Sequence, residues 1–326
     1  MKAMQCRAYG DPPELWTGEV EDPAPGPGEV LIDVEAVGLG YFDAVLLGGK
    51  YQEKPALPFV PGREHAGRVI ALGDGADPSL LGARVAAISF RGALAEKSVA
   101  LAAHCMAVPQ GMDAAAAGSF LSAYATSLYA LETRGAMREG ETVLVLGAAG
   151  TVGSAAIDVA KALGGRVVAA ASSPAKRDFC LERGADVVID YTQPSWRASL
   201  KEHLGGGGPD LIVDTVGGPA SEPAFRSIAP GGRHLVVGFA AGEIARLPLN
   251  LPLLKSASVV GVDWGGFMQR DPSGNRILLE RLGTLLETGR LRPEASTVHE
   301  LDEVASVLRA LLDRRSIGKP VILMRR

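Results

Sequence analysis

The feature that most constrains this chain is a glycine-rich segment between a short apolar run and an amphipathic helix. Residues 142–146 read Thr-Val-Leu-Val-Leu, which is typical of a buried strand, and residues 147–153 continue as Gly-Ala-Ala-Gly-Thr-Val-Gly. Residues 151–163 then place valine, alanine and leucine side chains on one helical face. A dinucleotide pyrophosphate needs backbone N–H groups that no Cβ obstructs, at the positive end of a helix dipole. The order strand, glycine loop, helix therefore predicts a dinucleotide-binding site.

Each glycine of this loop has its own expected steric role. Gly147 is expected to form the tight turn, Gly150 to let the backbone approach a phosphate, and Gly153 to let the helix pack closely on the strand. The spacing G-x-x-G-x-x-G is a variant of the usual fingerprint, and a plain turn is the alternative. The strands and helices that follow favour the cofactor site. The predicted loop also contains Ala148, Ala149, Thr151 and Val152.

The pattern of the chain changes at residue 141. After it, strands predicted at 142–146, 166–171, 186–189, 210–214, 233–237 and 258–262 mostly alternate with helices, which indicates a doubly wound parallel sheet. Before it, short strands and turns dominate, and helix is first expected near 113–131. The tail adds two helices, 276–287 and 301–312, and a strand at 320–324. The predicted fold class is α/β, with a Rossmann-like domain at 122–258 and a β-rich domain formed by 1–121 and 259–326.

Charge and cysteine content exclude several other classes of protein. The net charge of −4 comes without a basic cluster, so nucleic acid is not an expected partner. Three widely spaced cysteines argue against disulfides and structural zinc sites, and they suit a cytoplasmic protein. The N-terminus lacks the apolar run of a signal peptide, and no apolar stretch approaches the ~20 residues that span a bilayer. No membrane partner is expected.

The end of the second predicted strand bears on which nicotinamide cofactor binds. NAD sites usually place Asp or Glu there, about 20 residues past the loop, to accept both ribose hydroxyls. Here Ala171 is followed by Ser172 and Ser173, with Lys176 and Arg177 nearby. Hydroxyls, a helix N-terminus and a cation favour the 2′-phosphate of NADPH, although a Ser-Ser-Pro helix cap with solvated basic residues is the simpler interpretation. The missing acid favours NADPH.

Two further glycine-containing segments follow later strands of the predicted sheet. Val216 and Gly217 end the fourth strand, and Gly238 and Phe239 end the fifth. Ligands of open α/β sheets bind outside the carboxyl ends of the strands, so we expect these backbones to border the cofactor.

Several motifs together give the chain a family likeness. It resembles the medium-chain dehydrogenase/reductase superfamily, and within it the zinc-free quinone oxidoreductases related to zeta-crystallin. The resemblance covers essentially the whole length and implies a GroES-like first domain, a Rossmann-like second domain and a homodimer. Besides the glycine loop, the matching segments are residues 38–43 (GLGYFD), 49–51 (GKY), 58–67 (PFVPGREHAG), 237–239 (VGF) and 318–321 (GKPV).

The resemblance also implies that no metal is bound. Zinc-dependent relatives carry a cysteine where this chain has Gly40 and a histidine where it has Arg63, and glycine cannot ligate whereas a guanidinium repels the metal. The lobe that holds four cysteines in those relatives is absent. His65 beside Glu64 is the only tempting pair, and we interpret His65 as a packing or hydrogen-bonding residue.

By family position, Tyr41, Tyr51 and Thr126 are expected to face the nicotinamide and the substrate. The tyrosines are the predicted catalytic residues, since a phenol can donate to an oxyanion, and Thr126 is expected to hold the carboxamide. Many of these reductases carry asparagine where this chain has Gly40, so the family's substrate class does not carry over directly. Tyr191, after the third strand, resembles a 2′-phosphate contact.

The predicted function is an NADPH:quinone oxidoreductase-like activity that transfers hydride to a quinone or an α,β-unsaturated carbonyl without zinc. One alternative is an enoyl-thioester reductase acting on acyl-CoA, for which Arg63, Arg91 and Lys97 are candidate phosphate ligands if they converge. Another is a protein that binds NADPH without meaningful turnover.

Overall fold

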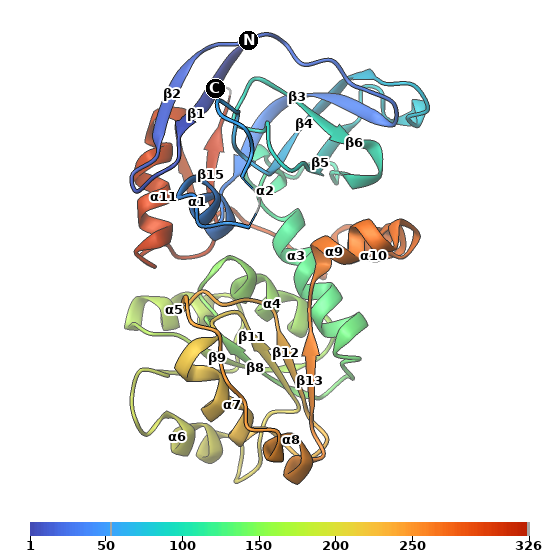
Figure 1. The fold of residues 1–326 in the computed structure, drawn as a ribbon. Helices are drawn as coiled ribbons and strands as arrows, with labels where there is room; N and C mark the ends of the chain where they lie inside the picture. The colour runs from blue at the N-terminus through green and yellow to red at the C-terminus, as the bar shows by residue number, and fades with distance from the viewer. Residues whose placement is uncertain (53, 325–326) are drawn as a thin grey trace. The chain divides into compact units, whose positions relative to one another are not determined.

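A large sheet organises each of the two compact units of the chain (Figure 1). The computed structural model describes residues 1–52 and 54–324. Its first unit comprises Met1–Ser122 together with the segment from Arg292 onward, and its second unit comprises Ala123–Leu291. In the described part of the chain, no helix combines the length and the apolar character that crossing a membrane requires.

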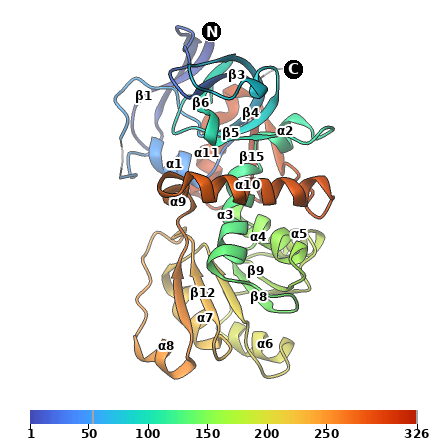
Figure 2. The same ribbon diagram turned by 90° about the vertical axis from the view of Figure 1, so that its right-hand side faces the viewer.

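The second unit contains a six-stranded sheet whose neighbouring strands are all parallel. The chain builds β8, β9 and β10 outward in one direction, then returns to the other side of β8 to build β11, β12 and β13. Figure 2 shows the neighbouring strands β8 and β9 beside α4. The strand order is therefore β10-β9-β8-β11-β12-β13, and the direction of winding switches between β8 and β11. This confirms the predicted Rossmann-like sheet. The strands are β8 (Thr142–Leu146), β9 (Arg166–Ala170), β10 (Val187–Ile189), β11 (Leu211–Asp214), β12 (Arg233–Val236) and β13 (Ser258–Gly261).

The strands of this sheet are apolar because helices cover it. Leu144, Val168 and Ile212 are fully buried on adjacent strands and form one core cluster with Phe225 of a covering helix. Near-continuous apolar runs are what a parallel sheet buried on both faces requires. The helices of the α/β repeat are α4 (Thr151–Ala162), α5 (Pro174–Glu182), α6 (Trp196–His203), α7 (Ser221–Ser227) and α8 (Asn250–Lys255).

The second unit extends to Leu291, beyond residue 258, where the sequence placed the return to the first domain. Two helices account for this extension, α9 (Trp264–Arg270) and α10 (Pro272–Glu287). They contact the π-helical segment Tyr129–Arg134, which follows α3 (Leu121–Leu128). Phe267 stacks on Tyr129 with ring centroids 4.5 Å apart, and Arg281 Nε lies 3.1 Å from Glu132 Oε1. These contacts are far apart in sequence, so local patterning gives no sign of them.

The first unit is built around one long strand, β3 (Glu29–Gly38). One edge of β3 pairs with β4 (Glu64–Leu72), and β3 also pairs with β6 (Lys97–Leu101) through residues 29–33 and with the C-terminal β15 (Pro320–Leu323) through residues 36–38. The remaining strands of the sheet are β5 (Arg84–Ile88), β7 (Cys105–Ala107) and β14 (Thr297–His299). The tail of the chain thus completes a sheet that the head begins.

Several elements of the first unit have no counterpart in the sequence prediction. Strands β1 (Lys2–Ala8) and β2 (Glu14–Glu19) form a separate antiparallel pair, and the short helix α1 (Tyr41–Leu47) packs on α11 (Val304–Leu312). The short strands β7 and β14 are likewise absent from the prediction. Helix is present where it was first expected, near 113–131, as α2 (Ala114–Ala117) and α3. Gly118 ends α2, where a Cβ would lie 2.7 Å from Ala36 of β3.

Candidate functional site

The glycine loop lies directly between β8 and α4, and backbone contacts fix its shape. Gly147 has φ of +68°, the left-handed region that favours glycine, and its carbonyl accepts the Gly150 N–H at 2.9 Å. A Cβ on Gly153 would lie 2.2 Å from the Gly147 carbonyl oxygen, so only glycine allows α4 to pass so close to the strand end. Gly150 is the N-cap of the 12-residue α4 and has no side chain to satisfy the N–H groups of the first turn.

The loop is adjacent to the segments that follow β11 and β12. A Cβ on Gly147 would lie 2.7 Å from Thr215 Oγ1, and one on Gly217 would lie 2.7 Å from Phe239 Cδ1. Three of the predicted cofactor-binding segments are therefore brought together at the carboxyl ends of the strands, where the sheet reverses its winding. This is the place at which open α/β sheets bind ligands.

A buried acid that the sequence reading did not single out supports this arrangement. Asp214, the last residue of β11, accepts hydrogen bonds from the backbone N–H groups of Val216 and Gly217, at 3.0 and 2.8 Å. It also accepts from the Ser221 hydroxyl and lies 3.0 Å from His234 Nε2 on β12. Burial alone would raise the pKa of Asp214, but these hydrogen bonds hold it below its ordinary value. Asp214 thus fixes the turn at Val216–Gly217.

The end of β9 holds the residues predicted to contact a 2′-phosphate. Ser173 is the N-cap of α5, with its hydroxyl accepting the Lys176 N–H at 3.4 Å, and Ser172 is exposed beside it. Arg177 is engaged elsewhere, since its guanidinium lies 3.0 Å from Asp190 Oδ2. Tyr191 follows β10 and packs, partly buried, against the core of the sheet. The helix cap of the Ser-Ser-Pro segment, which is the simpler interpretation of this sequence, is therefore present. It leaves Ser172 facing solvent.

In the first unit, α1 begins at the segment in which zinc-dependent relatives carry a ligand. Gly40 is its N-cap and donates its backbone N–H to Asp43 Oδ2 at 2.8 Å. Asp43 is 4% exposed, and its Oδ1 has no hydrogen-bond partner among the described residues. Burial raises the pKa of Asp43 to about 6, against the opposing effects of the Gly40 N–H and of nearby Lys319 and Arg63.

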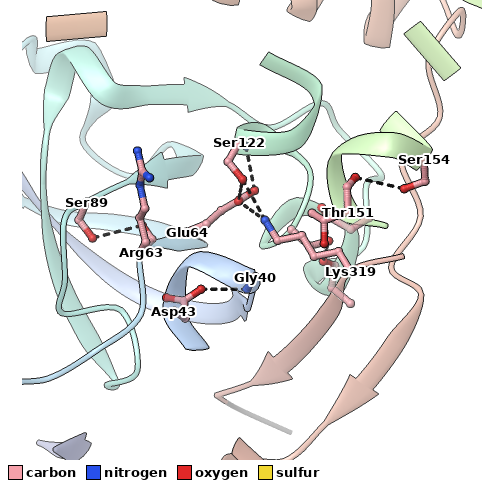
Figure 3. Close-up of polar contacts among 12 residues, drawn as sticks. Gly40, Asp43, Arg63, Glu64, Ser89, Ser122, Thr151, Ser154 and Lys319 are labelled. Carbon is pink, nitrogen blue, oxygen red and sulfur yellow. Dashed lines mark hydrogen bonds and ion pairs between the residues drawn. The ribbon is translucent and has the colours of Figure 1, made fainter. Parts of the chain in front are cut away.

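A buried charged group lies next to this helix (Figure 3). Glu64, at the start of β4, forms an ion pair with Lys319, which directly precedes β15, and both are under 10% exposed. Ser122 joins them, because its hydroxyl donates to Glu64 and lies 3.0 Å from Lys319 Nζ, while its backbone N–H donates to Glu64 Oε1 at 3.1 Å. Glu64 therefore has a lysine partner from the far end of the sequence. Its neighbour His65 is fully buried, and burial lowers the pKa of His65 to about 4.

Aromatic side chains gather on the other side of Arg63. The Phe42 ring contacts Tyr51 edge-on with centroids 4.7 Å apart, and Phe90 lies 6.4 Å away. The Arg63 guanidinium carbon lies 5.0 Å above the Phe42 ring. Tyr51 is half-buried in this group, whereas Tyr41, the first residue of α1, is 39% exposed. Thr126 belongs to the second unit, half-buried on α3.

No metal-binding geometry is found in the residues that the structure describes. Among them, no group of three or more His, Cys, Asp or Glu side chains could hold a metal ion. Gly40 has no side chain to offer a metal, and its backbone N–H and carbonyl are both hydrogen-bonded to Asp43.

The chain has a glycine loop at the winding switch of a parallel sheet, and its two ends form a β-rich unit. Together these features define the class of two-domain dehydrogenases and reductases. Family models agree: the alcohol dehydrogenase GroES-like domain matches residues 26–145, and the zinc-binding dehydrogenase model matches residues 151–277. Quinone oxidoreductase-like protein 2 of Mus musculus is 34% identical over 99% of this chain and 92% of its own length. The chain therefore belongs to the quinone oxidoreductase-like proteins of the medium-chain dehydrogenase/reductase superfamily.

Solved structures show the same relationship. A probable oxidoreductase from Mycobacterium abscessus is 36% identical, with a TM-score of 0.88 over 99% of this chain and 98% of that one. The quinone oxidoreductase of Thermus thermophilus, solved alone and with NADPH, is 32% identical, with a TM-score of 0.83 over 99% of this chain and 100% of that one. The GroES-like first domain and the Rossmann-like second domain expected from the sequence are thus confirmed.

Proposed function

We propose that this protein is a zinc-independent reductase that uses NADPH to reduce quinones or α,β-unsaturated carbonyl compounds. The observation that carries the proposal is the glycine loop, where the Gly147 turn, the open Gly150 and the close approach at Gly153 form a cradle that no Cβ fills. The family relationship supports it, since a relative of known structure is described as a quinone oxidoreductase in complex with NADPH.

We assign the residues that would hold the cofactor by their place at the strand ends. The backbone of residues 147–153 and the N-terminus of α4 suit a pyrophosphate. The turn at Val216–Gly217, fixed by Asp214, and the segment Gly238–Phe239 suit the adjoining nucleoside. When bound, NADPH supplies a hydride, which is two electrons and one proton, to the acceptor and is left as NADP⁺.

The preference for NADPH over NADH rests on the residues after β9 and β10. Asp190 is the acid at this edge, and its ion pair with Arg177 occupies the carboxylate that would otherwise accept ribose hydroxyls. Ser172, Ser173, Lys176 and Tyr191 are left as the side chains expected near a 2′-phosphate.

Chemistry without a metal suits acceptors that take up hydride readily, because no Lewis acid polarises their carbonyl. The residues of the first unit would then supply hydrogen bonds to the acceptor's oxygen. Tyr51 and Tyr41 have phenol groups for this purpose, and Thr126 of the second unit is assigned to the carboxamide of the nicotinamide.

We further propose a homodimer that works in the cytoplasm. Strand β13 is the edge of its sheet, its Val259 is 49% exposed, and Leu249, Leu253 and Leu254 near it are each at least 75% exposed. An apolar sheet edge of this kind is suited to pairing with a second copy.

The cysteines support the proposed cytoplasmic location, because they are free thiols, which suit a reducing compartment.

A panel of acceptors tests this function. Consumption of NADPH, followed by its absorbance, is expected with 1,4-benzoquinone or 9,10-phenanthrenequinone, with kcat/KM at least about 10-fold lower for NADH, in protein shown to be zinc-free by metal analysis. Turnover of crotonyl-CoA alone would assign the protein to enoyl-thioester reduction. NADPH binding without turnover on any acceptor would contradict the proposal. So would one equivalent of bound zinc whose removal abolishes the activity.

The role of Tyr51 has its own test. Tyr51→Phe removes one hydroxyl and keeps the ring contact with Phe42, so we expect kcat/KM for the best acceptor to fall about 10-fold with NADPH affinity unchanged. Tyr9→Phe is a matched control, because Tyr9 donates its hydroxyl to the Pro55 carbonyl in the same unit. Full activity in Tyr51→Phe would show that this phenol is not an oxyanion donor.

A further inference from the structure

Arg63 is a half-buried cation whose guanidinium has no acidic partner among the residues that the structure describes. Its backbone is held firmly, since its carbonyl accepts the Ser89 N–H at 2.9 Å, and it directly precedes β4. Its guanidinium lies over the Phe42 ring and makes no hydrogen bond or ion pair with any residue in the described part of the chain. A half-buried guanidinium usually has an acceptor, because its five N–H donors lose water on burial.

Two described acids of this region have other partners. Glu64, the next residue, turns toward Lys319 and Ser122, and Figure 3 shows the Arg63 side chain directed away from that group. Asp43 accepts the Gly40 N–H with one carboxylate oxygen, and its other oxygen has no hydrogen-bond partner among the described residues. Within the described part of the chain, no ion pair therefore neutralises the positive charge of Arg63.

The surroundings of the guanidinium are aromatic. Phe42 lies beneath it, with Tyr51 and Phe90 around Phe42, and Phe90 is 42% exposed. The cation–π contact holds the guanidinium carbon over the Phe42 ring, and such a contact leaves N–H donors available to another acceptor. Aromatic rings also offer flat apolar contact to a planar molecule, so this corner combines a surface for a ring with a cation for an oxygen.

We propose that Arg63 is a catalytic residue that binds the oxygen of the acceptor and stabilises the negative charge formed there on reduction. The proposal rests on the proposed function: an acceptor that takes up hydride gains one negative charge, which stays on its oxygen until a proton from water neutralises it. In this chain the guanidinium takes the electrophilic task that a metal ion performs in zinc-dependent relatives. The acceptor class that it selects is planar, with an oxygen at the edge of the conjugated system.

A binding measurement tests this without turnover and without cofactor. The probes are 2,4-dinitrophenolate, a planar oxyanion at pH 7.5, and 1,3-dinitrobenzene, its neutral counterpart, each titrated calorimetrically into the full chain. We expect the phenolate to bind at least about 10-fold more tightly, since a hydrogen bond to a charged group contributes about that much. In Arg63→Met the preference should disappear, and in Arg63→Lys it should fall to an intermediate value.

Arg68→Met is the matched control, because Arg68 is an exposed arginine of the adjacent strand β4 that donates to the Gly82 carbonyl, and this variant should keep the full preference. Thermal unfolding of each variant separates loss of binding from loss of fold. A wild type with no preference for the phenolate, or an Arg63→Met variant that keeps it, would overturn the proposal. Failure of the proposed reductase function gives a different result. The protein would then keep its preference for the phenolate but would reduce no acceptor.

Discussion

Replacing Gly150 with alanine is expected to weaken NADPH binding by about 10- to 100-fold while the second unit stays folded. A Cβ on Gly150 would lie 3.2 Å from the Gly147 carbonyl oxygen, a contact that small shifts relieve, and otherwise points into open space. That space is where a pyrophosphate would meet the first turn of α4. The methyl group would hold the phosphate away from the N–H groups, and charge-assisted hydrogen bonds of about 1.5–3 kcal/mol would be lost.

Gly207→Ala provides a closely matched control for this experiment. Gly207 lies in an exposed turn of the same unit, and its Cβ would lie 3.3 Å from the Leu204 carbonyl oxygen, nearly the same contact as at Gly150. NADPH affinity, measured by fluorescence titration, should be unchanged in this variant. Equal affinity in Gly150→Ala and Gly207→Ala would place the pyrophosphate elsewhere.

The second large effect concerns the response of stability to pH. The pKa of Asp43 is about 6 in the folded protein against an ordinary value of 3.8, so between these pH values the folded state binds more protons than the unfolded one. The free energy of unfolding therefore falls by up to about 3 kcal/mol as pH rises through this window. Asp43→Asn keeps an acceptor for the Gly40 N–H and removes the buried charge. We expect the variant to exceed the wild type in stability by about that amount at pH 7.5, and not at pH 4.

His65 makes this prediction sharper, because its effect has the opposite sign. Its pKa falls from 6.5 to about 4 on folding, so the unfolded state binds more protons between these values and stability is lost as pH falls through them. In the wild type the two residues largely offset each other. Asp43→Asn should reveal the acid sensitivity that His65 confers, as a fall of about 3 kcal/mol in the free energy of unfolding between pH 7 and pH 4.

Denaturant titrations across this pH range, with Asp113→Asn as control, measure the effect. Asp113 caps α2 in the same unit by accepting the Ala116 N–H at 2.8 Å, but it is exposed. Its substitution makes the same chemical change at an exposed carboxyl group, so it controls for effects that do not depend on burial. If the free energies of unfolding of Asp43→Asn and wild type differ by the same amount at every pH, Asp43 is not a buried carboxyl group that resists ionisation.

The sequence predicts the second unit well because its signals are local. Strand β8 has the predicted bounds, and the other five strands of the sheet differ by one residue at an end. An apolar run that ends in glycine and continues as an amphipathic helix needs no distant contact to be recognised. Since parallel strands present their carboxyl ends to one edge, the meeting of Gly147, Gly217 and Phe239 also follows from topology.

The parts that the sequence did not predict depend on distant partners. Glu64 pairs with Lys319, 255 residues later, through a strand register that no local pattern encodes. Asp214 and His234 meet because β11 and β12 are neighbours in a particular register. The helical region near 113–131 was expected, but its division at Gly118 was not, because it results from the approach of β3, a tertiary constraint that outweighs the high helix propensity of alanine.

The return of the chain to its first sheet also sets an order of assembly during synthesis. Residues 123–291 form a continuous unit and can fold as soon as they leave the ribosome, whereas β3 lacks β15, and Glu64 lacks its lysine, until residues near 320 have been made. The first unit is thus begun first and completed last. A nascent chain stalled before residue 319 would contain every residue of the second unit, while the first sheet would still lack β15 and Glu64 would still lack Lys319.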